Sequence, residues 1–414
     1  MKKFFVFGNY GALSIAEIYK LTGEKNFHFF SNRFCILDFF GDEKKVLQNS
    51  GGSVKSGKVF EVQKISGNFD ENFLQEVVIK FLSTKKFEKQ KITFGVSFVG
   101  SFDSNFKKKI KEILKSELLK KGIKSRFLDN KTDLLASATL KFNKVLQEGF
   151  EIVVIKSDEN LIFGETSENQ DVDRWSKKDF ERPNRDTTHG LLQPKLARMM
   201  INLARSLNDN FSISEKKSRE TLKILDPSCG SGTILQEAVD LGFDVVGSDI
   251  AQTSVDFSKK NLQWFCQNFE KKFDLQNIFL HDVKKDFPLK FEKFFDSIVT
   301  EPFMGSQISK SLSFENFLNR SKELIYLYAK SFDSFAKVLK PSGRVIFAFP
   351  LTLVEDKYKK LSFEGKVLEK GFKIISPQKF LPILSRFSGI TERGFIFGTN
   401  DQFVKREIVI FEKV

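Results

Sequence analysis

The segment at residues 226–233, with the sequence DPSCGSGT, constrains the fold of this chain more than any other. The apolar residues 222–225 before it predict a buried strand, and residues 233–241 after it predict a helix. A second apolar run at residues 244–248 then ends at Asp249. This order of strand, glycine-rich turn, helix and strand is typical of a βαβ unit that binds a ligand at the carboxyl ends of its strands.

The glycines of this turn indicate close approach to a ligand. Gly230 and Gly232 allow backbone dihedrals that a Cβ would forbid, and Asp249 stands where an acid accepts hydrogen bonds from a ribose diol. The turn lacks the spaced GxGxxG of nicotinamide-binding units, and the chain has no GxxxxGK[ST] phosphate loop. We therefore expect S-adenosylmethionine rather than NAD or ATP as the ligand, with a purely structural turn as the alternative.

Further strands extend the expected sheet. Residues 277–280 predict a third strand, after which Asp282 can accept a hydrogen bond from an adenine amine. Residues 297–299 predict a fourth strand and residues 344–349 a fifth. Alternating strands and helices that end in a hairpin predict an α/β fold with a mostly parallel sheet and one antiparallel strand.

The loop after the fourth strand has the groups that methylation of an exocyclic amine requires. The amine lone pair is delocalised into the ring, so an acceptor has to draw the amine hydrogens and stabilise the developing positive charge. A flat apolar side chain has to hold the extruded base. We expect Glu301 and the carbonyls around Pro302 as acceptors and Phe303 as the stacking group; a proline loop that caps a strand is the alternative.

The charge of the chain favours a polyanionic partner. It has 67 Lys and Arg against 53 Asp and Glu, a formal net charge of +14, and basic clusters gain affinity by releasing counterions from phosphates. Residues 106–131 contain ten Lys and Arg against three acids, around an expected amphipathic helix. A solvated helix face is the alternative reading of this stretch. To RNA binding we assign Lys107, Lys108, Lys111, Lys115, Lys124 and Arg126.

Three cysteines lie far apart and form no CxxC pair. This argues against structural zinc or a disulfide framework and for a reducing compartment. The N-terminal apolar run is interrupted at Gly8, too early for a signal peptide, and no apolar run reaches the roughly 18 residues of a membrane span. We therefore expect a cytoplasmic protein with no metal and no membrane partner.

At 414 residues the chain is expected to form two or three domains. Residues 1–60 predict a small α+β module, and residues 61–166 predict a second α/β region. The polar residues 167–187 predict a linker. Residues 188–414 contain the cofactor unit and the catalytic loop.

With these motifs the sequence resembles the tRNA guanosine N2-methyltransferases that join an N-terminal RNA-binding THUMP domain to a Rossmann-like methyltransferase domain. The resemblance covers most of residues 60–350. Residues 165–171 resemble the end of the THUMP domain and residues 181–186 the linker signature of the family. Residues 190–204 are similar to its helix before the cofactor unit, and residues 225–233 to its first cofactor motif.

The resemblance implies a class I Rossmann-like methyltransferase fold with a seven-stranded, mostly parallel sheet behind ferredoxin-like and THUMP modules. It implies that Asp226, Gly230 and Gly232 surround the methionine part of S-adenosylmethionine. It also implies that Asp249 holds the ribose and Asp282 meets the adenine. To this site we add Ser228, Thr233, Ile250, Leu192 and Pro194, and to the RNA surface we add Arg182 and Arg185.

The catalytic loop departs from the DPPY followed by Gly that is usual in this family. Counting back from Gly305 places Glu301 on the acid and Met304 on the aromatic position. If Pro302 and Phe303 are instead aligned with the second proline and the tyrosine of DPPY, Thr300 falls on the acid position. We prefer Phe303 as the aromatic, because methionine stacks poorly, and keep Glu301 as the nearest carboxylate.

The sequence therefore predicts an S-adenosylmethionine-dependent RNA methyltransferase, with tRNA as the RNA partner and N2-methylguanosine as the first candidate product. The same chemistry on ribosomal RNA, or on an adenine amine, is the second candidate. A catalytically inactive RNA-binding homologue is the third. A DNA amine methylase is disfavoured because the THUMP-like region resembles an RNA binder. The participation of a small activator subunit is left open.

Overall fold

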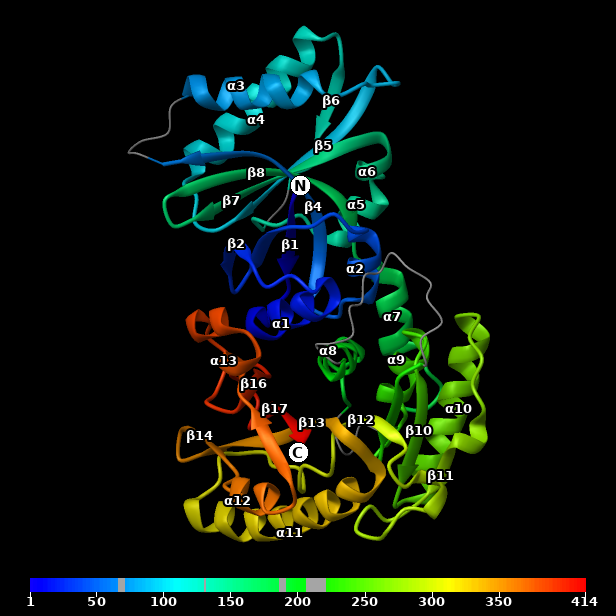
Figure 1. Ribbon diagram of the computed structural model, residues 1–414. Coiled ribbons are helices and arrows are strands. Elements are labelled where there is room, and N and C mark those ends of the chain that lie inside the picture. The colour runs from blue at the N-terminus through cyan, green and yellow to red at the C-terminus, as the bar shows by residue number, and fades with distance from the viewer. Residues whose placement is uncertain (66–70, 130–131, 186–190, 206–220) are drawn as a thin grey trace. The chain divides into compact units, whose positions relative to one another are not determined.

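The computed structural model of the protein describes residues 1–65, 71–129, 132–185, 191–205 and 221–414. Contacts between Cα atoms divide the chain into two compact units. The N-terminal unit comprises Met1–Gly11, Glu24–Gln48 and Ser53–Val172. The C-terminal unit comprises Ala12–Gly23, Asn49–Gly52 and Asp173–Val414. Each unit has a sheet of its own, and Figure 1 labels most of the strands.

The N-terminal unit is built on an eight-stranded sheet with the order β2-β3-β1-β4-β8-β7-β5-β6. Its strands are β1 (Lys2–Phe7), β2 (Phe27–Ser31), β3 (Phe34–Asp38), β4 (Ser53–Lys64), β5 (Lys91–Val99), β6 (Lys124–Phe127), β7 (Gly149–Ser157) and β8 (Asn160–Asn169). Its helices are α2 (Glu43–Asn49), α3 (Glu71–Ser83), α4 (Ser104–Lys120), α5 (Ser137–Phe142) and α6 (Val145–Glu148). The apolar rows of α3 and α4, among them Phe81 and Ile110, share one core with Phe94 of β5.

Strand β4 makes this sheet continuous across residue 60. On one edge Gly57 pairs with Phe4 of β1, and on the other edge Val59 pairs with Gly164 of β8. Both edges of β4 therefore have their backbone groups satisfied by strands of the same sheet. The structure differs here from the predicted division into modules at residues 1–60 and 61–166, because a boundary at this point would cut through a central strand.

Helix α1 (Gly11–Thr22) belongs by its contacts almost entirely to the C-terminal unit. Its Glu17 is fully buried and accepts hydrogen bonds from Ser50 Oγ at 2.6 Å, Gly51 N at 2.8 Å and Asn202 Nδ2 at 2.7 Å. Burial raises the pKa of Glu17, and these donors oppose the rise. A polar cluster built from three distant segments thus joins α1 to the unit that contains the cofactor motif.

The predicted linker contains regular structure. Strand β8 extends to Asn169, and helix α7 spans Val172–Phe180. In α7 the side chain of Lys178 is 1% exposed and lies 3.0 Å from Glu237 and 2.7 Å from Asp240. The structure differs from the predicted linker because its polar residues form buried ion pairs, and such pairing leaves no apolar pattern in the sequence.

The C-terminal unit has a main sheet with the order β11-β10-β9-β12-β13-β17-β15. Its strands are β9 (Lys223–Asp226), β10 (Asp244–Asp249), β11 (Ile278–Leu280), β12 (Phe295–Thr300), β13 (Leu339–Val354), β15 (Phe372–Ile375) and β17 (Val404–Lys413). Strand β17 is antiparallel to both β13 and β15, whereas β9 to β13 are parallel. The predicted seven-stranded, mostly parallel sheet is confirmed; β14 (Lys357–Lys360) and β16 (Gly394–Phe397) extend it.

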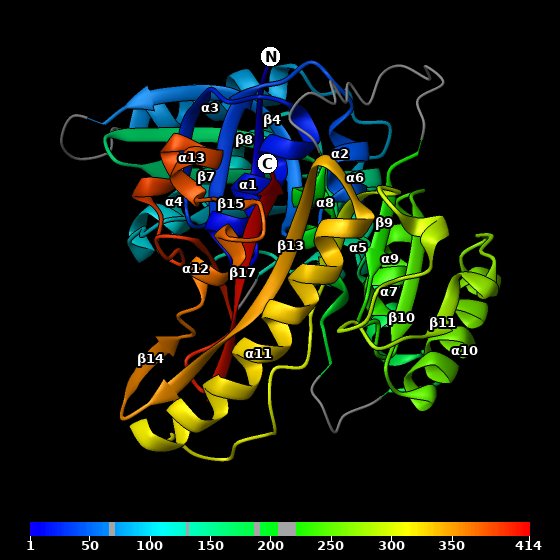
Figure 2. The ribbon, with the colours of Figure 1, turned by 60° about the horizontal axis from the view of Figure 1, so that its bottom comes forward.

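The helices of the C-terminal unit bury the rest of the apolar surface. Besides α1 and α7 they are α8 (Pro194–Ala204), α9 (Thr233–Asp240), α10 (Gln252–Asn268), α11 (Phe314–Val338), α12 (Glu364–Leu368) and α13 (Pro377–Phe380). Figure 2 shows α11 lying along β13. Phe332 of α11 packs edge-on against Phe411 of β17, with ring centroids 4.9 Å apart. This packing fixes α11 against β17 of the same sheet.

Candidate active site

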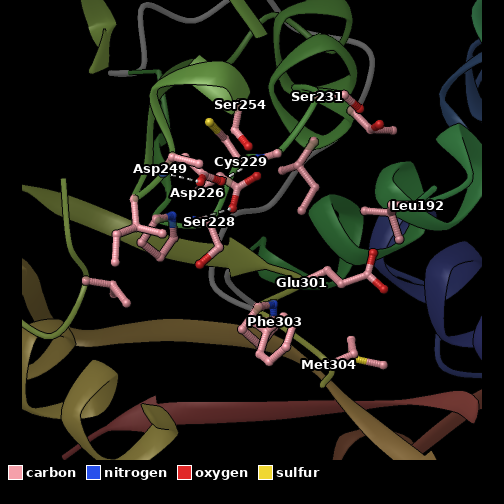
Figure 3. Close-up of a pocket in the computed structure, with 18 of the residues that line it drawn as sticks. Leu192, Asp226, Ser228, Cys229, Ser231, Asp249, Ser254, Glu301, Phe303 and Met304 are labelled. Carbon is pink, nitrogen blue, oxygen red and sulfur yellow. Dashed lines mark hydrogen bonds between the residues drawn. The ribbon is translucent and has the colours of Figure 1, made fainter. Parts of the chain in front are cut away.

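The candidate site is a cavity of about 360 Å³ at the carboxyl ends of β9, β10 and β12. This is where an open parallel sheet places its ligand. Figure 3 shows side chains from the glycine-rich turn and from the loop after β12 around this cavity. The predicted residues that line it are Leu192, Asp226, Ser228, Gly230, Thr233, Asp249, Ile250, Asp282, Glu301, Pro302 and Phe303.

Three predicted residues lie next to this cavity without lining it. Pro194 is buried in the first turn of α8, where its fixed φ suits a helix start. Gly232 caps α9 with a φ of 84°. Thr300 is fully buried at the end of β12.

The glycine-rich turn positions the carboxylate of Asp249. The backbone amide of Gly230 donates to its Oδ2 at 2.9 Å, and the amide of Ala251 donates to its Oδ1 at 3.0 Å. Gly230 has a φ of 51°, a conformation that favours glycine. A Cβ on Gly232 would lie 3.0 Å from Leu262 and from the Ser258 hydroxyl. The turn therefore needs both glycines, and Asp249 is oriented before any ligand arrives.

Asp226 forms the buried end of the site. It is 1% exposed and accepts hydrogen bonds from Thr300 Oγ1 at 2.9 Å and from the Ser228 amide at 3.3 Å. Burial raises the pKa of Asp226 to about 8, and the nearby carboxylates of Asp249 and Glu301 add to the rise. A carboxyl of this kind ionises readily only when a positive charge comes close, so this end of the cavity suits a cationic group.

Asp282 lines the cavity just beyond the end of β11. Its Oδ1 accepts from the amide of Lys284 at 3.0 Å, and its Oδ2 lies 3.7 Å from the ammonium group of the same lysine. The neighbouring His281 packs its ring 4.1 Å from that of Phe287, between centroids. Burial lowers the pKa of His281. These contacts keep the Asp282 carboxylate at the rim of the cavity.

The loop after β12 brings an acid and an aromatic side chain to the same cavity. Glu301 and Phe303 both line it (Figure 3). The side chain of Phe303 is 47% exposed. Arg406 of β17 donates from its Nε to Oε1 of Glu301 at 2.5 Å. Met304 also lines the cavity, so the structure brings both candidate aromatic positions to the site.

Thr300 cannot take the acid position of the alternative alignment in this geometry. Its hydroxyl is directed to Asp226, and its side chain is closed off from the cavity. Glu301 instead lines the cavity, and its Oε1 accepts from Arg406 Nε. Glu301 thus stays the predicted acid, and because both Phe303 and Met304 line the cavity, the preference for Phe303 as the aromatic also stays a prediction.

Two side chains of α11 hold the backbone of this loop. Tyr328 donates its hydroxyl to the carbonyl of Phe303 at 2.8 Å, and Arg320 donates to the carbonyl of Met304 at 2.8 Å. Gly305 has a φ of 89°, and a Cβ there would lie 2.4 Å from Cζ of Arg320. Sequence reasoning missed both residues, because nothing local marks a helix residue that bonds to a loop some 15 to 25 positions earlier.

Arg182 was assigned to the RNA surface, and the structure corrects this assignment. Arg182 is 4% exposed, and its Nη1 donates to Thr233 Oγ1 at 2.7 Å. The adjacent Asn184 exchanges two backbone hydrogen bonds with the side chain of Asn261, which also donates to the Ser231 carbonyl. This segment therefore supports the glycine-rich turn. Asp186 and Gly190 of the quoted motifs lie outside the described residues.

The remaining basic residues fall into two groups. Lys107 pairs with Asp133, and Lys111 lies 3.5 Å from Asp129, so both are partly neutralised. A second group is exposed: Lys108, Lys115, Lys124, Arg126 and Arg185. In this group Lys108 forms a surface ion pair, 3.9 Å from Glu112. Lys124 and Arg126 lie on the same face of β6, because alternate residues of a strand share a face.

The described part of the chain contains no group of three or more His, Cys, Asp or Glu side chains arranged to hold a metal ion. Among its helices none is long and apolar enough to cross a membrane.

The sheet order and the cavity at its strand ends define a class I Rossmann-like methyltransferase fold. Accordingly, a family model described as "Methyltransferase domain" matches residues 218–386. The crystal structure of TrmN from Thermus thermophilus has a similar fold, with a TM-score of 0.54 at 15% identity over 100% of this chain and 99% of that chain.

Two curated relatives share part of this chain. The tRNA (guanine(10)-N2)-dimethyltransferase of Methanothermobacter thermautotrophicus is 34% identical over 162 residues, which are 39% of this chain and 39% of the relative. The enzyme of the same name from Pyrococcus abyssi is 28% identical over 180 residues, 44% of this chain and 43% of the relative. The matched region thus spans less than half the length of either relative.

Proposed function

We propose that this protein is an S-adenosylmethionine-dependent RNA methyltransferase that forms N2-methylguanosine in tRNA. The observation that carries the proposal is that one cavity brings together Asp226, Asp249 and Glu301. The first two suit a cofactor with a ribose and a positive charge, and the third suits an amine that loses a proton. The names of the relatives support tRNA and the guanine amine as the target.

The residues present fit S-adenosylmethionine. Asp249 offers a carboxylate that two backbone amides already orient. At Gly230 the backbone has no Cβ, so a ligand can come close to it. Asp226 would face the charged methionine part, Asp249 the ribose and Asp282 the adenine. The bound cofactor supplies an electrophilic methyl group.

The chemistry on the substrate side belongs to Glu301 and Phe303. Phe303 would stack the extruded base beside the methyl group, and Oε2 of Glu301 would accept from the amine and take its proton as the new C–N bond forms. An ionised carboxylate only accepts hydrogen bonds. The guanine edge presents two neighbouring donors, N1–H and the N2 amine, whereas adenine presents an acceptor beside its amine. The acceptor chemistry of Glu301 therefore favours guanine.

The N-terminal unit is proposed to bind the RNA as a THUMP-like region. Its exposed cations Lys108, Lys115, Lys124 and Arg126 on α4 and β6 would contact phosphates and so hold the RNA without reading its sequence.

Nucleoside mass spectrometry of unmodified tRNA tests this proposal. The RNA is incubated with the full-length protein and S-adenosylmethionine that carries a labelled methyl group, then digested. We expect labelled N2-methylguanosine. Labelled N6-methyladenosine would show that the acceptor site reads adenine. A parallel incubation with unmodified ribosomal RNA tests the other RNA class, and label found there but not in tRNA would show that ribosomal RNA is the substrate. Binding of tRNA with no label in any nucleoside would support the inactive homologue instead.

A further inference from the structure

The ion pair between Glu301 and Arg406 joins the candidate catalytic loop to the antiparallel strand of the sheet. Arg406 Nε donates to Glu301 Oε1 at 2.5 Å, and the two side chains are only 16% and 13% exposed. Among the described residues this arginine is the partner of that carboxylate. The two residues come from segments that are 105 positions apart, so the pair forms only in the folded unit.

The backbone of Arg406 is fixed on both sides. It pairs with Pro350 of β13 and with Phe397 of β16. Arg406 does not line the cavity, whereas Glu301 does. The arginine therefore approaches the carboxylate from the sheet, and the substrate would approach it from the cavity.

Contacts other than the one with Arg406 already hold the loop backbone after Glu301 in place, but they do not hold the Glu301 side chain. Tyr328 and Arg320 already hold the loop backbone that follows it. Three rotatable bonds still separate the Glu301 backbone from its carboxylate. If these bonds rotate freely, the carboxylate is aligned with the reacting amine for a smaller fraction of the time, and the reaction slows. In addition, the buried carboxyl of Asp226 is close enough for Glu301 to raise its pKa, so a cation beside Glu301 offsets repulsion between the two acids.

We propose that Arg406 is a positioning residue for methyl transfer. It binds Oε1 of Glu301 and thereby holds Oε2 toward the cavity, where the exocyclic amine of the base would donate to it. This inference rests on the proposed function, because it assigns Glu301 the role of acceptor. It also accounts for glutamate in place of the usual aspartate, since the longer side chain can contact the arginine and the substrate with different oxygens.

Arg406 acts in this account through Glu301 alone, so its removal should affect the chemical step and not cofactor binding. We expect Arg406→Gln to lower the single-turnover rate by about 10-fold to 100-fold, the range that follows from loss of alignment at a reacting atom. The dissociation constant for S-adenosylmethionine and the KM for tRNA should stay within about twofold of the parent values. Arg406→Lys, which keeps the charge, should recover part of the rate.

The double variant separates positioning from general stability. Once Glu301→Gln has removed the acceptor charge, adding Arg406→Gln should cost less than about twofold more in rate, because the arginine no longer has its target. A stability role would instead lower the rate again. Lys405→Gln is the matched control: it removes a cation one position earlier on β17, where Lys405 bonds to Asn400 at 2.7 Å. It should leave the rate unchanged.

The experiment measures single-turnover methylation of tRNA by the parent and these variants, with calorimetry for the cofactor and thermal melting as a folding check. Equal rates for the parent and Arg406→Gln, or additive losses in the double variant, would overturn the inference while the proposed function stands. A parent product other than N2-methylguanosine would overturn the proposed function, and a rate loss confined to Arg406→Gln and Glu301→Gln would still support the positioning role. A parent that methylates no RNA would overturn both.

Discussion

The hydroxyl of Thr300 donates to the buried carboxyl of Asp226 at 2.9 Å, and this bond joins the ends of two adjacent parallel strands, β12 and β9. Asp226 is on the side of the proposed cofactor, and Thr300 directly precedes the acid of the candidate catalytic loop. The two halves of the site thus share one hydrogen bond at their base. The pKa of Asp226 therefore depends on groups in both halves of the site, among them Thr300 and Glu301.

The affinity for S-adenosylmethionine should rise with pH up to about 8. Burial raises the pKa of Asp226 to about 8 in the free protein, and a bound positive charge favours the ionised carboxylate. Binding below pH 8 therefore has to release a proton, which weakens it. Calorimetry between pH 6 and pH 8.5 in buffers of different ionisation enthalpy measures this release. Asp226→Asn should remove it; the same proton release in the variant would assign it to another group.

Protonation of Asp226 should also affect the stability of the protein without cofactor, but here the effect of rising pH is unfavourable. A carboxyl whose folded pKa is raised binds its proton more tightly in the folded state, so it stabilises the fold at low pH and that stability is lost as pH rises toward about 8. Thermal melting without cofactor should show the contribution of Asp226 falling between about pH 4 and pH 8. The decline should be smaller in Asp226→Asn than in the parent.

Arg182→Met should weaken S-adenosylmethionine binding by about 10-fold, the loss expected when a buried charged hydrogen bond is removed. Arg182 bonds to Thr233, which lines the cavity, and so supports the turn that orients the cofactor. Arg185→Met is the matched control, because Arg185 is an exposed arginine of the same segment. Equal affinities for the two variants would show that Arg182 only stabilises the fold.

The salt dependence of tRNA binding should distinguish the exposed from the paired lysines of α4. Lys108 and Lys115 are both exposed, and the pair of Lys108 with Glu112 is a solvent-exposed contact of 3.9 Å. Replacing both by Gln should reduce the slope of log affinity against log salt by about 0.7 to 0.9 for each phosphate that the protein no longer neutralises. Lys107 and Lys111 are already paired with Asp133 and Asp129, so their replacement should change it less. Equal slopes for both pairs and the parent would mean that this helix face is only solvated.

The sequence predicted the geometry of the glycine-rich turn and its contact with Asp249 because these signals are local. The glycines at 230 and 232 and the acid at 249 follow each other within one βαβ unit, and the backbone geometry of that unit places them together. The seven-stranded sheet followed from the same alternation of strands and helices. Predictions of this kind succeed where chain neighbours in sequence are also neighbours in space.

The predictions that differ from the structure concern contacts between distant segments. Arg182 looked like a surface cation, yet Thr233 and burial give it a structural partner. The polar sequence of α7 gives no sign that Lys178 pairs with Asp240. The sequence around Arg406 likewise does not indicate its contact with Glu301. A charge in a sequence does not reveal whether it faces water or another charge, because both patterns are equally polar.

The role of Glu301 is tested most directly by the rate of N2-methylguanosine formation in a single turnover on unmodified tRNA. The account predicts that Glu301→Gln, which keeps the shape and removes the charge, slows this step by about 10²-fold or more and leaves the affinity for S-adenosylmethionine unchanged. Thr300→Val, which removes the hydrogen bond to Asp226, should cost less. A Glu301→Gln enzyme with the full rate beside an inactive Thr300→Val enzyme would contradict the account and place the acceptor at Thr300.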